Sequence, residues 1–273
     1  MTITSESFNY VADLVRQRSG IILETGKEYL VEGRLLPLAR AAAADDVDAY
    51  LRALRNAPHP ARLESVVDAL TTNETSWFRD AQPFQALVDH VVPEVRAARG
   101  AGPLRVWSAA CSSGQEPYSI AMALADVLPA GGLEILATDL SAEMIERART
   151  ARYSQLEVNR GLPITMLVKY FQRTGAEWEV VPELRSQVTF KRHNLLELPP
   201  AGGQFDIVFM RNVLIYFDLA TKQEVLRRVQ RVVRPGGYLL LGAAETTLGI
   251  DDTWVRVPVG RGAVYRHEAR RAA

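Results

Sequence analysis

After residue 103, short apolar runs typical of buried strands alternate with segments of helical spacing. This order favours a parallel sheet with helices on both faces, so the predicted fold class is α/β, Rossmann-like and doubly wound. Two final runs that turn at Gly260 and Gly262 predict a closing hairpin, which adds an antiparallel edge. The expected strands are 104–109, 133–139, 188–196, 205–210 and 238–244, the last after a turn at 234–237, and the expected helices are 117–128, 142–150 and 220–233.

The first part of the chain carries helical patterns instead. Gly20 is suited to end the first helix, and Asp45 or Asp46 to cap the third. The second helix, from about Lys27 to Ala44, contains Pro37, where we expect a kink or a break. The expected domains are a helical domain over 1–72, a linker and bridging helix (Pro83–Arg99) over 73–103, and an α/β domain over 104–273, with an insertion at about 151–187 that contains a short helix (Ile164–Tyr170) and a hairpin around Gly175.

Composition restricts the classes of protein that fit. Lys and Arg equal Asp and Glu in number, whereas a dedicated nucleic-acid-binding protein usually carries a basic excess. Cys111 is the only cysteine, which excludes an intrachain disulfide. The first ten residues lack a signal-peptide pattern, and no apolar run reaches the ~18 residues of a membrane span. We expect a soluble cytoplasmic protein without stable membrane insertion and without a nucleic-acid partner.

The turn after the first strand predicts a cofactor site. It is built from small residues, Ala109 and Ala110 through Ser113, and runs into a helix after a single glycine, Gly114. Three glycines would be needed for a dinucleotide fingerprint, and the chain has no phosphate-binding GxxxxGK[ST] loop. These absences disfavour a nicotinamide dehydrogenase and favour a nucleoside cofactor without phosphates, S-adenosyl-L-methionine. The alternative is a tight turn with no ligand.

Two carboxylates accompany this turn. Asp139 ends the second strand and is spaced to accept hydrogen bonds from ribose hydroxyls, although it could equally cap the next helix. Glu116 opens the helix after the first strand, where it can accept a hydrogen bond from the cofactor or simply complement the helix dipole.

Polar residues also follow later strands, where ligands of such sheets bind. Asn194 could pair with an adenine edge while Leu195 packs on the ring, but Asn194 alone is as easily a turn former. Arg211 and Asn212 follow the strand 205–210, without the Asn/Asp-Pro-Pro-aromatic pattern of base-amine methyltransferases. A polar segment ending in Trp77-Phe78-Arg79 joins the two domains, and its alternative role is a packing anchor between them.

Taken together, the motifs resemble the bacterial chemotaxis receptor glutamate O-methyltransferases, the CheR family. The resemblance covers essentially the whole chain and implies a class I S-adenosylmethionine methyltransferase fold with a small N-terminal helical domain and a small antiparallel β insertion. The segments that carry it are NETSWFRD, SAACSSGQEPYSIAM, LATDLS, RNVLIYFD and RPGGYLLLGAAET, in this order.

The resemblance also implies roles for particular residues. Arg79 and Tyr216 would lie nearest the transferable methyl and act as the catalytic residues, and no metal is expected. S-adenosyl-L-homocysteine would be the product. The implied cofactor-binding residues are Asn73, Thr75, Arg79, Ala109, Glu116, Asp139, Asn194, Leu195, Arg211 and Asn212.

The implied reaction is methylation of glutamate side chains on the cytoplasmic helical bundle of chemoreceptors, in chemotaxis adaptation. Lys27, Arg34 and Arg40 could face that acidic bundle or form an ordinary solvated surface. Some family members bind a receptor C-terminal pentapeptide through a longer glycine-rich loop, and the short hairpin loop here predicts an enzyme that works without it. We expect a monomer. The alternatives are a methyltransferase outside chemotaxis and a non-catalytic module that binds S-adenosylmethionine or S-adenosylhomocysteine.

Overall fold

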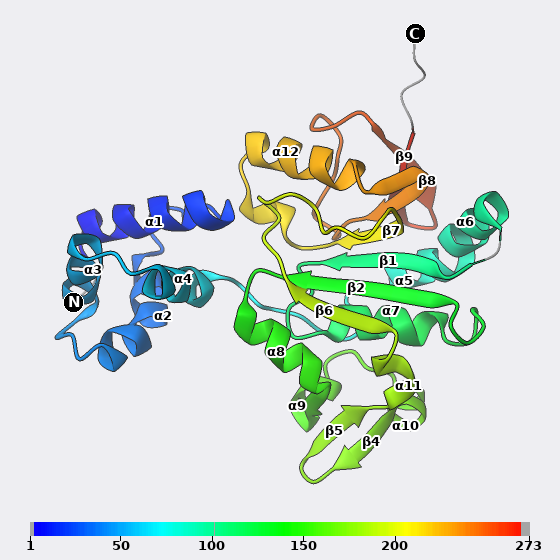
Figure 1. Cartoon of the computed structure of the whole chain (residues 1–273), viewed down its shortest axis with the longest axis horizontal. Coiled ribbons are helices and arrows are strands. Elements are labelled where there is room, and N and C mark those ends of the chain that lie inside the picture. The colour runs from blue at the N-terminus through cyan, green and yellow to red at the C-terminus, as the bar shows by residue number, and fades with distance from the viewer. Residues whose placement is uncertain (1–2, 101, 269–273) are drawn as a thin grey trace. The chain divides into compact units, whose positions relative to one another are not determined.

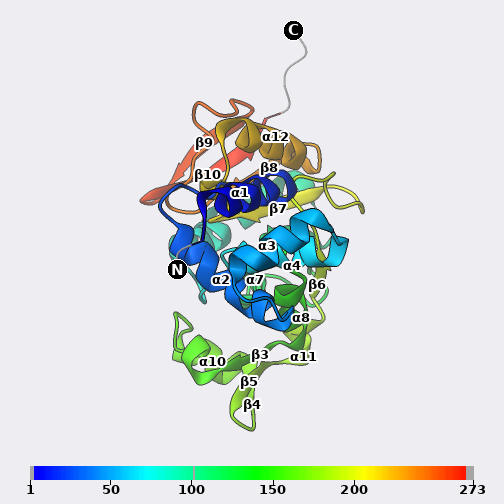
Figure 2. The same cartoon turned by 90° about the vertical axis from the view of Figure 1, so that its left-hand side faces the viewer.

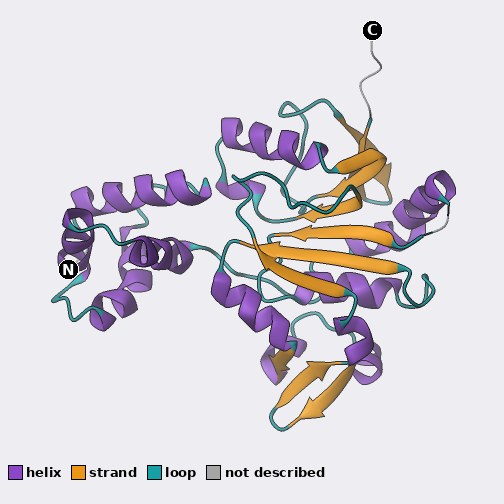
Figure 3. Ribbon diagram, viewed as in Figure 1, coloured by secondary structure: helices purple, strands orange, loops and turns teal. Residues whose placement is uncertain are grey.

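The computed structural model describes residues 3–100 and 102–268, and the chain divides into two compact units (Figure 1). The helical unit comprises Met1–Thr72 and Tyr216–Thr221. The larger unit comprises Asn73–Ile215 and Lys222–Ala273, and contains all the strands found among the described residues (Figure 3). Among the described residues, no helix is long and apolar enough to cross a membrane.

Local signals define the helices of the helical unit. Gly20 ends α1 in the left-handed region at φ 77°, and the Asp46 side chain accepts the Ala49 N–H at 2.6 Å to cap α3. Of the kink or break expected at Pro37, the break is wrong, because α2 continues through this residue, with Val31, Leu35 and Ala39 buried on either side of it. The helices are α1 (Ser5–Ser19), α2 (Glu28–Ala41), α3 (Val47–Asn56) and α4 (Pro60–Leu70).

A mixed sheet forms the centre of the larger unit. Within the described residues it has seven strands in the order β6-β2-β1-β7-β8-β10-β9. The first five are parallel, and β10 pairs antiparallel with β8 and β9, so the predicted closing hairpin is confirmed. The strands are β1 (Leu104–Ala109), β2 (Leu133–Asp139), β6 (Val188–Arg192), β7 (Phe205–Met210), β8 (Val233–Leu240), β9 (Trp254–Val259) and β10 (Gly262–His267).

Two strand predictions need correction. β6 ends at Arg192, because His193 and Asn194 begin a turn. The strand expected over 238–244 is β8, which begins at Val233 and ends at Leu240. The expected turn at 234–237 lies inside β8 as an irregularity in its pairing with β7, where Phe205 faces Val233 but Ile207 faces Tyr238. The β7 backbone approaches closely here, since a Cβ on Gly237 would lie 2.8 Å from the Asp206 carbonyl oxygen.

The bridging helix predicted over 83–99 is divided into three parts. A π-helical turn, η1 (Leu87–Val91), separates α5 (Gln82–Ala86) from α6 (Val92–Arg99). Pro93 lacks the N–H that would continue a regular α-helix, and the wide turn immediately precedes it. The other helices of the unit are α7 (Gln115–Leu124), α8 (Ala142–Thr150), α9 (Gln155–Val158), α10 (Ile164–Tyr170), α11 (Pro182–Arg185), the 3₁₀ helix η2 (Leu214–Tyr216) and α12 (Leu219–Gln230).

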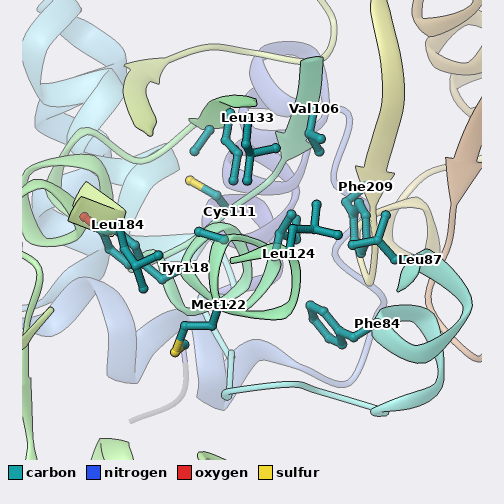
Figure 4. Close-up of a cluster of buried hydrophobic side chains, with 14 of the residues drawn as sticks. Phe84, Leu87, Val106, Cys111, Tyr118, Met122, Leu124, Leu133, Leu184 and Phe209 are labelled. Atoms are coloured by element: carbon teal, nitrogen blue, oxygen red, sulfur yellow. The ribbon is translucent and has the colours of Figure 1, made fainter. Parts of the chain in front are cut away.

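One continuous apolar cluster holds the sheet to its helices. Val106 of β1 and Phe209 of β7 project from one face of the sheet toward Phe84 of α5 and toward Tyr118 and Met122 of α7 (Figure 4). All five side chains are buried. Burying each such side chain contributes about 1.5–3 kcal/mol, so this face supplies much of the stability of the larger unit.

The insertion forms a small antiparallel sheet apart from the large one (Figure 2). The predicted hairpin is confirmed as β4 (Phe171–Thr174) and β5 (Glu177–Val180), joined by Gly175 and Ala176. A third strand, β3 (Arg152–Ser154), pairs with β5 and was not predicted, because three residues are too short to show alternation.

Asp206 lies near the amino ends of the parallel strands and is 2% exposed. Its Oδ2 accepts the backbone N–H of Arg105 at 2.8 Å and pairs with the Arg99 guanidinium at 2.8 Å. A carboxylate with these partners links β7, β1 and the end of α6. It lies at the edge of the sheet opposite to the predicted cofactor site.

We therefore expect Asp206→Ala to destabilise the larger unit by about 3 kcal/mol, because it leaves a half-buried guanidinium and a backbone N–H without their acceptor. All four tryptophans, Trp77, Trp107, Trp178 and Trp254, belong to that unit, so urea unfolding followed by tryptophan fluorescence measures the loss. Asp252→Ala, at an exposed position, is the control and should change stability by about 0.5 kcal/mol or less. Equal losses in the two variants would contradict this role.

Candidate functional site

The loop after β1 adopts a conformation that small residues allow. Ala110 and Ser112 have φ of 65° and 50°, and Gly114 has φ of 95° at the start of α7. A Cβ on Gly114 would lie 2.9 Å from the Tyr153 hydroxyl oxygen and 3.0 Å from the Ala148 Cβ. The single glycine of the loop is thus required by close packing and by its left-handed backbone.

Asp139, at the carboxyl end of β2, fixes this loop. Its Oδ2 accepts the Ser112 N–H at 2.7 Å, and its Oδ1 accepts the Ser141 N–H at 2.9 Å. The cap of α8 is Ser141, whose hydroxyl accepts the Met144 N–H, so Asp139 does not itself cap the helix. The carboxylate, 8% exposed, joins the two loops that follow β1 and β2.

The segment that leads into the larger unit lies against the same loop. The Asn73 carbonyl oxygen accepts the Ser112 hydroxyl at 2.8 Å, and the Phe78 N–H donates to the Ser119 hydroxyl at 3.1 Å. Trp77 is buried and contacts Tyr153 edge-to-face, with ring centroids 4.8 Å apart. Trp77 therefore anchors the segment within the larger unit, against the insertion.

The backbone around Arg79 is strained. Phe78, Asp80 and Ala81 have φ of 46°, 64° and 39°, values that non-glycine residues adopt at a cost of about 1–3 kcal/mol each. The Arg79 Nη1 donates to the Glu74 carbonyl oxygen at 3.0 Å. Such strain persists only where surrounding contacts impose it, and it is common at ligand-binding segments.

Arg211 supplies contacts that hold the strained backbone around Arg79 in place. Its side chain is 1% exposed. The guanidinium pairs with Glu116 at 3.1 Å and with Asp80 at 2.8 Å, and it donates to the Arg79 carbonyl oxygen at 2.6 Å. It thereby connects the end of β7 to α7 and to the strained segment. These protein groups engage the guanidinium, and direct contact between Arg211 and the cofactor stays a prediction.

Burial controls the protonation of the groups at this edge. It raises the pKa of the Glu116 carboxyl, although the Arg211 guanidinium and the Ser108 hydroxyl lower it. Burial also raises the pKa of the Cys111 thiol, which keeps it protonated at neutral pH and unsuited to act as a nucleophile. The pKa of His193 is lowered by burial, which favours a neutral imidazole.

The remaining predicted residues lie in or near turns. The Asn194 Oδ1 accepts the Leu196 N–H at 3.0 Å, so this amide does form a turn, and the adjacent Leu195 is half-buried. Thr75 is half-buried in the 73–81 segment, whereas Ala109 is fully buried at the end of β1.

The helical unit holds several of the other predicted residues. Tyr216 ends η2 and clusters with that unit, where its carbonyl oxygen accepts the Ile22 N–H at 3.0 Å. Arg34 donates to the Leu70 carbonyl oxygen at 3.0 Å, and Lys27 pairs with Glu24 at 2.8 Å. The contacts of Arg34 favour a structural role for this residue, whereas Lys27 and Arg40 are exposed.

Sequence reasoning missed Glu245, which follows β8 at the carboxyl edge. This side chain is 9% exposed, and both of its carboxylate oxygens accept backbone N–H groups, including that of Asn212 at 2.7 Å. An acidic residue just past a buried strand was the available signal. Glu245 also borders a cavity of about 320 Å³, together with Asp80, Arg256 and Arg261.

Comparison with known proteins identifies the family. Residues 73–260 match the model described as "CheR methyltransferase, SAM binding domain", and residues 6–71 match "CheR methyltransferase, all-alpha domain". The chain is 40% identical to "Chemotaxis protein methyltransferase 1" of Pseudomonas aeruginosa over 97% of this chain and 99% of that protein. It is 38% identical to "Chemotaxis protein methyltransferase" of Escherichia coli over 90% of this chain and 86% of that protein.

A family model that covers most of the larger unit agrees with the α/β fold and the cofactor predicted from the turn after β1. The chain belongs to the CheR methyltransferase family, with S-adenosylmethionine as its cofactor.

Proposed function

We propose that the protein methylates glutamate side chains on the cytoplasmic helical bundle of chemoreceptors and forms glutamate 5-O-methyl esters in chemotaxis adaptation. Family membership and the names of the relatives support a chemotaxis methyltransferase. The proposal places the protein in the cytoplasm, where it acts as a monomer. The observation that carries it is the 73–81 segment, which is held under strain at the loop after β1 with Arg79 at its centre.

The groups at the carboxyl edge fit a nucleoside that carries no phosphate. They are carboxylates, side-chain amides and small residues, without the glycine cradle that a pyrophosphate needs. We assign Asp139 to the ribose hydroxyls, Asn194 and Leu195 to the adenine, and Asn73 with Glu116 to the methionine part. Thr75, Ala109, Arg211 and Asn212 complete the cofactor-binding set.

The reaction requires alignment of the carboxylate and the methyl group more than it requires proton transfer. A glutamate carboxylate is already ionised at neutral pH, so its oxygen can attack the methyl group without a general base. S-adenosylmethionine supplies a methyl group activated by the sulfonium. Alignment of the two reactants can contribute about 7–11 kcal/mol. In this proposal Arg79 orients the receptor carboxylate through paired hydrogen bonds, and the Tyr216 hydroxyl shares that task, because too strong an ion pair would weaken the nucleophile.

We expect Arg79→Ala to lower methyl transfer about 100-fold, because the carboxylate loses its orientation. The measurement uses methyl-labelled S-adenosylmethionine and receptor-containing membranes, with alkali release of labelled methanol. Arg231→Ala, at an exposed position, is the matched control and should retain full activity. If Arg79→Ala left both turnover and cofactor affinity intact, the assignment of Arg79 would be wrong.

We expect Asp139→Asn to raise the cofactor Kd about tenfold, a loss of about 1.4 kcal/mol. The amide nitrogen would face one of the two backbone N–H groups, of Ser112 or Ser141, and would disturb the loop it holds. Titration calorimetry with S-adenosylhomocysteine measures the change. Glu143→Gln, on the exposed side of α8, is the control. An unchanged Kd in Asp139→Asn would remove Asp139 from the cofactor site.

The two-residue turn between β4 and β5 predicts that the protein works without a receptor C-terminal pentapeptide. Titration calorimetry with such a peptide should show no saturable heat, and removal of the pentapeptide from the receptor should leave the methylation rate unchanged. Tight binding of the peptide would contradict the prediction.

A non-catalytic regulatory module is the alternative function. The assay separates the two, because an enzyme forms methyl esters, from which alkali releases methanol, only when receptor is present. Cofactor binding without any release, on several receptors, would favour the module.

A further inference from the structure

The Glu245 carboxylate accepts hydrogen bonds from five backbone N–H groups, the longest from Ile215 at 3.4 Å. Its Oε2 accepts from Asn212 and from Gly242, both at 2.7 Å. Its Oε1 accepts from Val213 at 2.9 Å and from Leu214 at 2.7 Å. One side chain therefore fixes two loops, the loop after β8 and the loop after β7.

These bonds determine the course of the chain after β7. Asn212 has φ of 57°, a left-handed conformation that the bond to Glu245 stabilises. Leu214 begins η2, where the first N–H groups have no partner inside the helix. A carboxylate at this end satisfies those donors.

Gly242 lies close to the side chains of Glu245 and Asn212. A Cβ at this position would lie 2.8 Å from the Glu245 Oε2 and 2.8 Å from the Asn212 Nδ2. The backbone of Gly242 is not in the left-handed region, so the requirement for glycine comes from the close approach of these two side chains. A side chain at position 242 would therefore displace the carboxylate or the Asn212 amide.

We propose that Glu245 is a positioning residue for methyl transfer: its carboxylate sets the backbone of Asn212 for cofactor binding and the start of η2. This inference rests on the proposed function, and on the cofactor-binding role proposed for Asn212. Glu245 does not touch the reacting atoms in this proposal; it acts through the loop that it holds.

The chain offers a matched control for a purely structural role. Asp206 is also a buried carboxylate and also accepts a backbone N–H, from Arg105, but at the opposite edge of the sheet. Asp206→Asn should lower stability without changing the kinetics of the folded protein. A positioning role for Glu245 predicts a kinetic loss that this control lacks.

The test compares Glu245→Gln with Asp206→Asn in the full chain. Glutamine keeps the size of the side chain, but its amide nitrogen cannot accept the N–H groups that one carboxylate oxygen now accepts. We expect the Kd for S-adenosylhomocysteine to rise about tenfold in Glu245→Gln, and kcat at saturating cofactor to fall at least tenfold. Asp206→Asn should stay within twofold of wild type in both, while urea unfolding shows an equal or larger loss of stability.

Gly242→Ala is the second variant, and it keeps the carboxylate intact. The added methyl group pushes Glu245 and Asn212 apart, so this variant should reproduce the loss of cofactor affinity and of kcat. It also provides a measurement if Glu245→Gln does not fold.

The outcomes separate this inference from the proposed function. Values within twofold of wild type in Glu245→Gln or Gly242→Ala, or equal kinetic losses in Asp206→Asn, would overturn the positioning role. If wild type binds S-adenosylhomocysteine but methylates no receptor, the proposed function fails, and the change in Kd still decides whether Glu245 positions Asn212.

Discussion

The arrangement of the candidate site depends on one buried cation. Arg211 is almost inaccessible to water and contacts Glu116 of α7, Asp80 and the Arg79 carbonyl oxygen. Removing a guanidinium from water costs several kcal/mol, and only partners in good geometry offset that cost. The end of β7, the start of α7 and the strained turn around Asp80 must therefore be in place together.

Carboxylates that accept backbone N–H groups hold the rest of the carboxyl edge. Asp139 joins the loops after β1 and β2, and Glu245 joins the loops after β7 and β8. Hydrogen bonds to an ionised acceptor are stronger than those between neutral groups, so each carboxylate fixes a loop with little side-chain bulk. Such an edge suits a reaction that needs alignment of two reactants more than a catalytic base.

Much of this edge was predictable, because parallel strands end at the same side of a sheet. That rule alone brings Asp139 and Arg211 to one edge, since each ends or follows a strand with a clear apolar pattern. The contacts of Glu245 were not predictable, because its partners are backbone groups that belong to another loop and leave no pattern in the sequence. The pairing irregularity in β8 escaped prediction for a similar reason: Pro235 and Gly236 are typical of turns, and only the neighbouring β7 keeps that stretch in the sheet.

The sequence by itself determined the α/β class, most strand positions, the caps of α1 and α3, and the family, since these follow from local pattern and from motifs. Tertiary structure decided which partner each polar group takes. In the folded chain, the Arg211 guanidinium binds Glu116. Ser141 rather than Asp139 caps α8, and Tyr216 belongs to the helical unit. Local propensity is encoded within a few residues, whereas the satisfaction of buried polar groups depends on segments far apart in the chain.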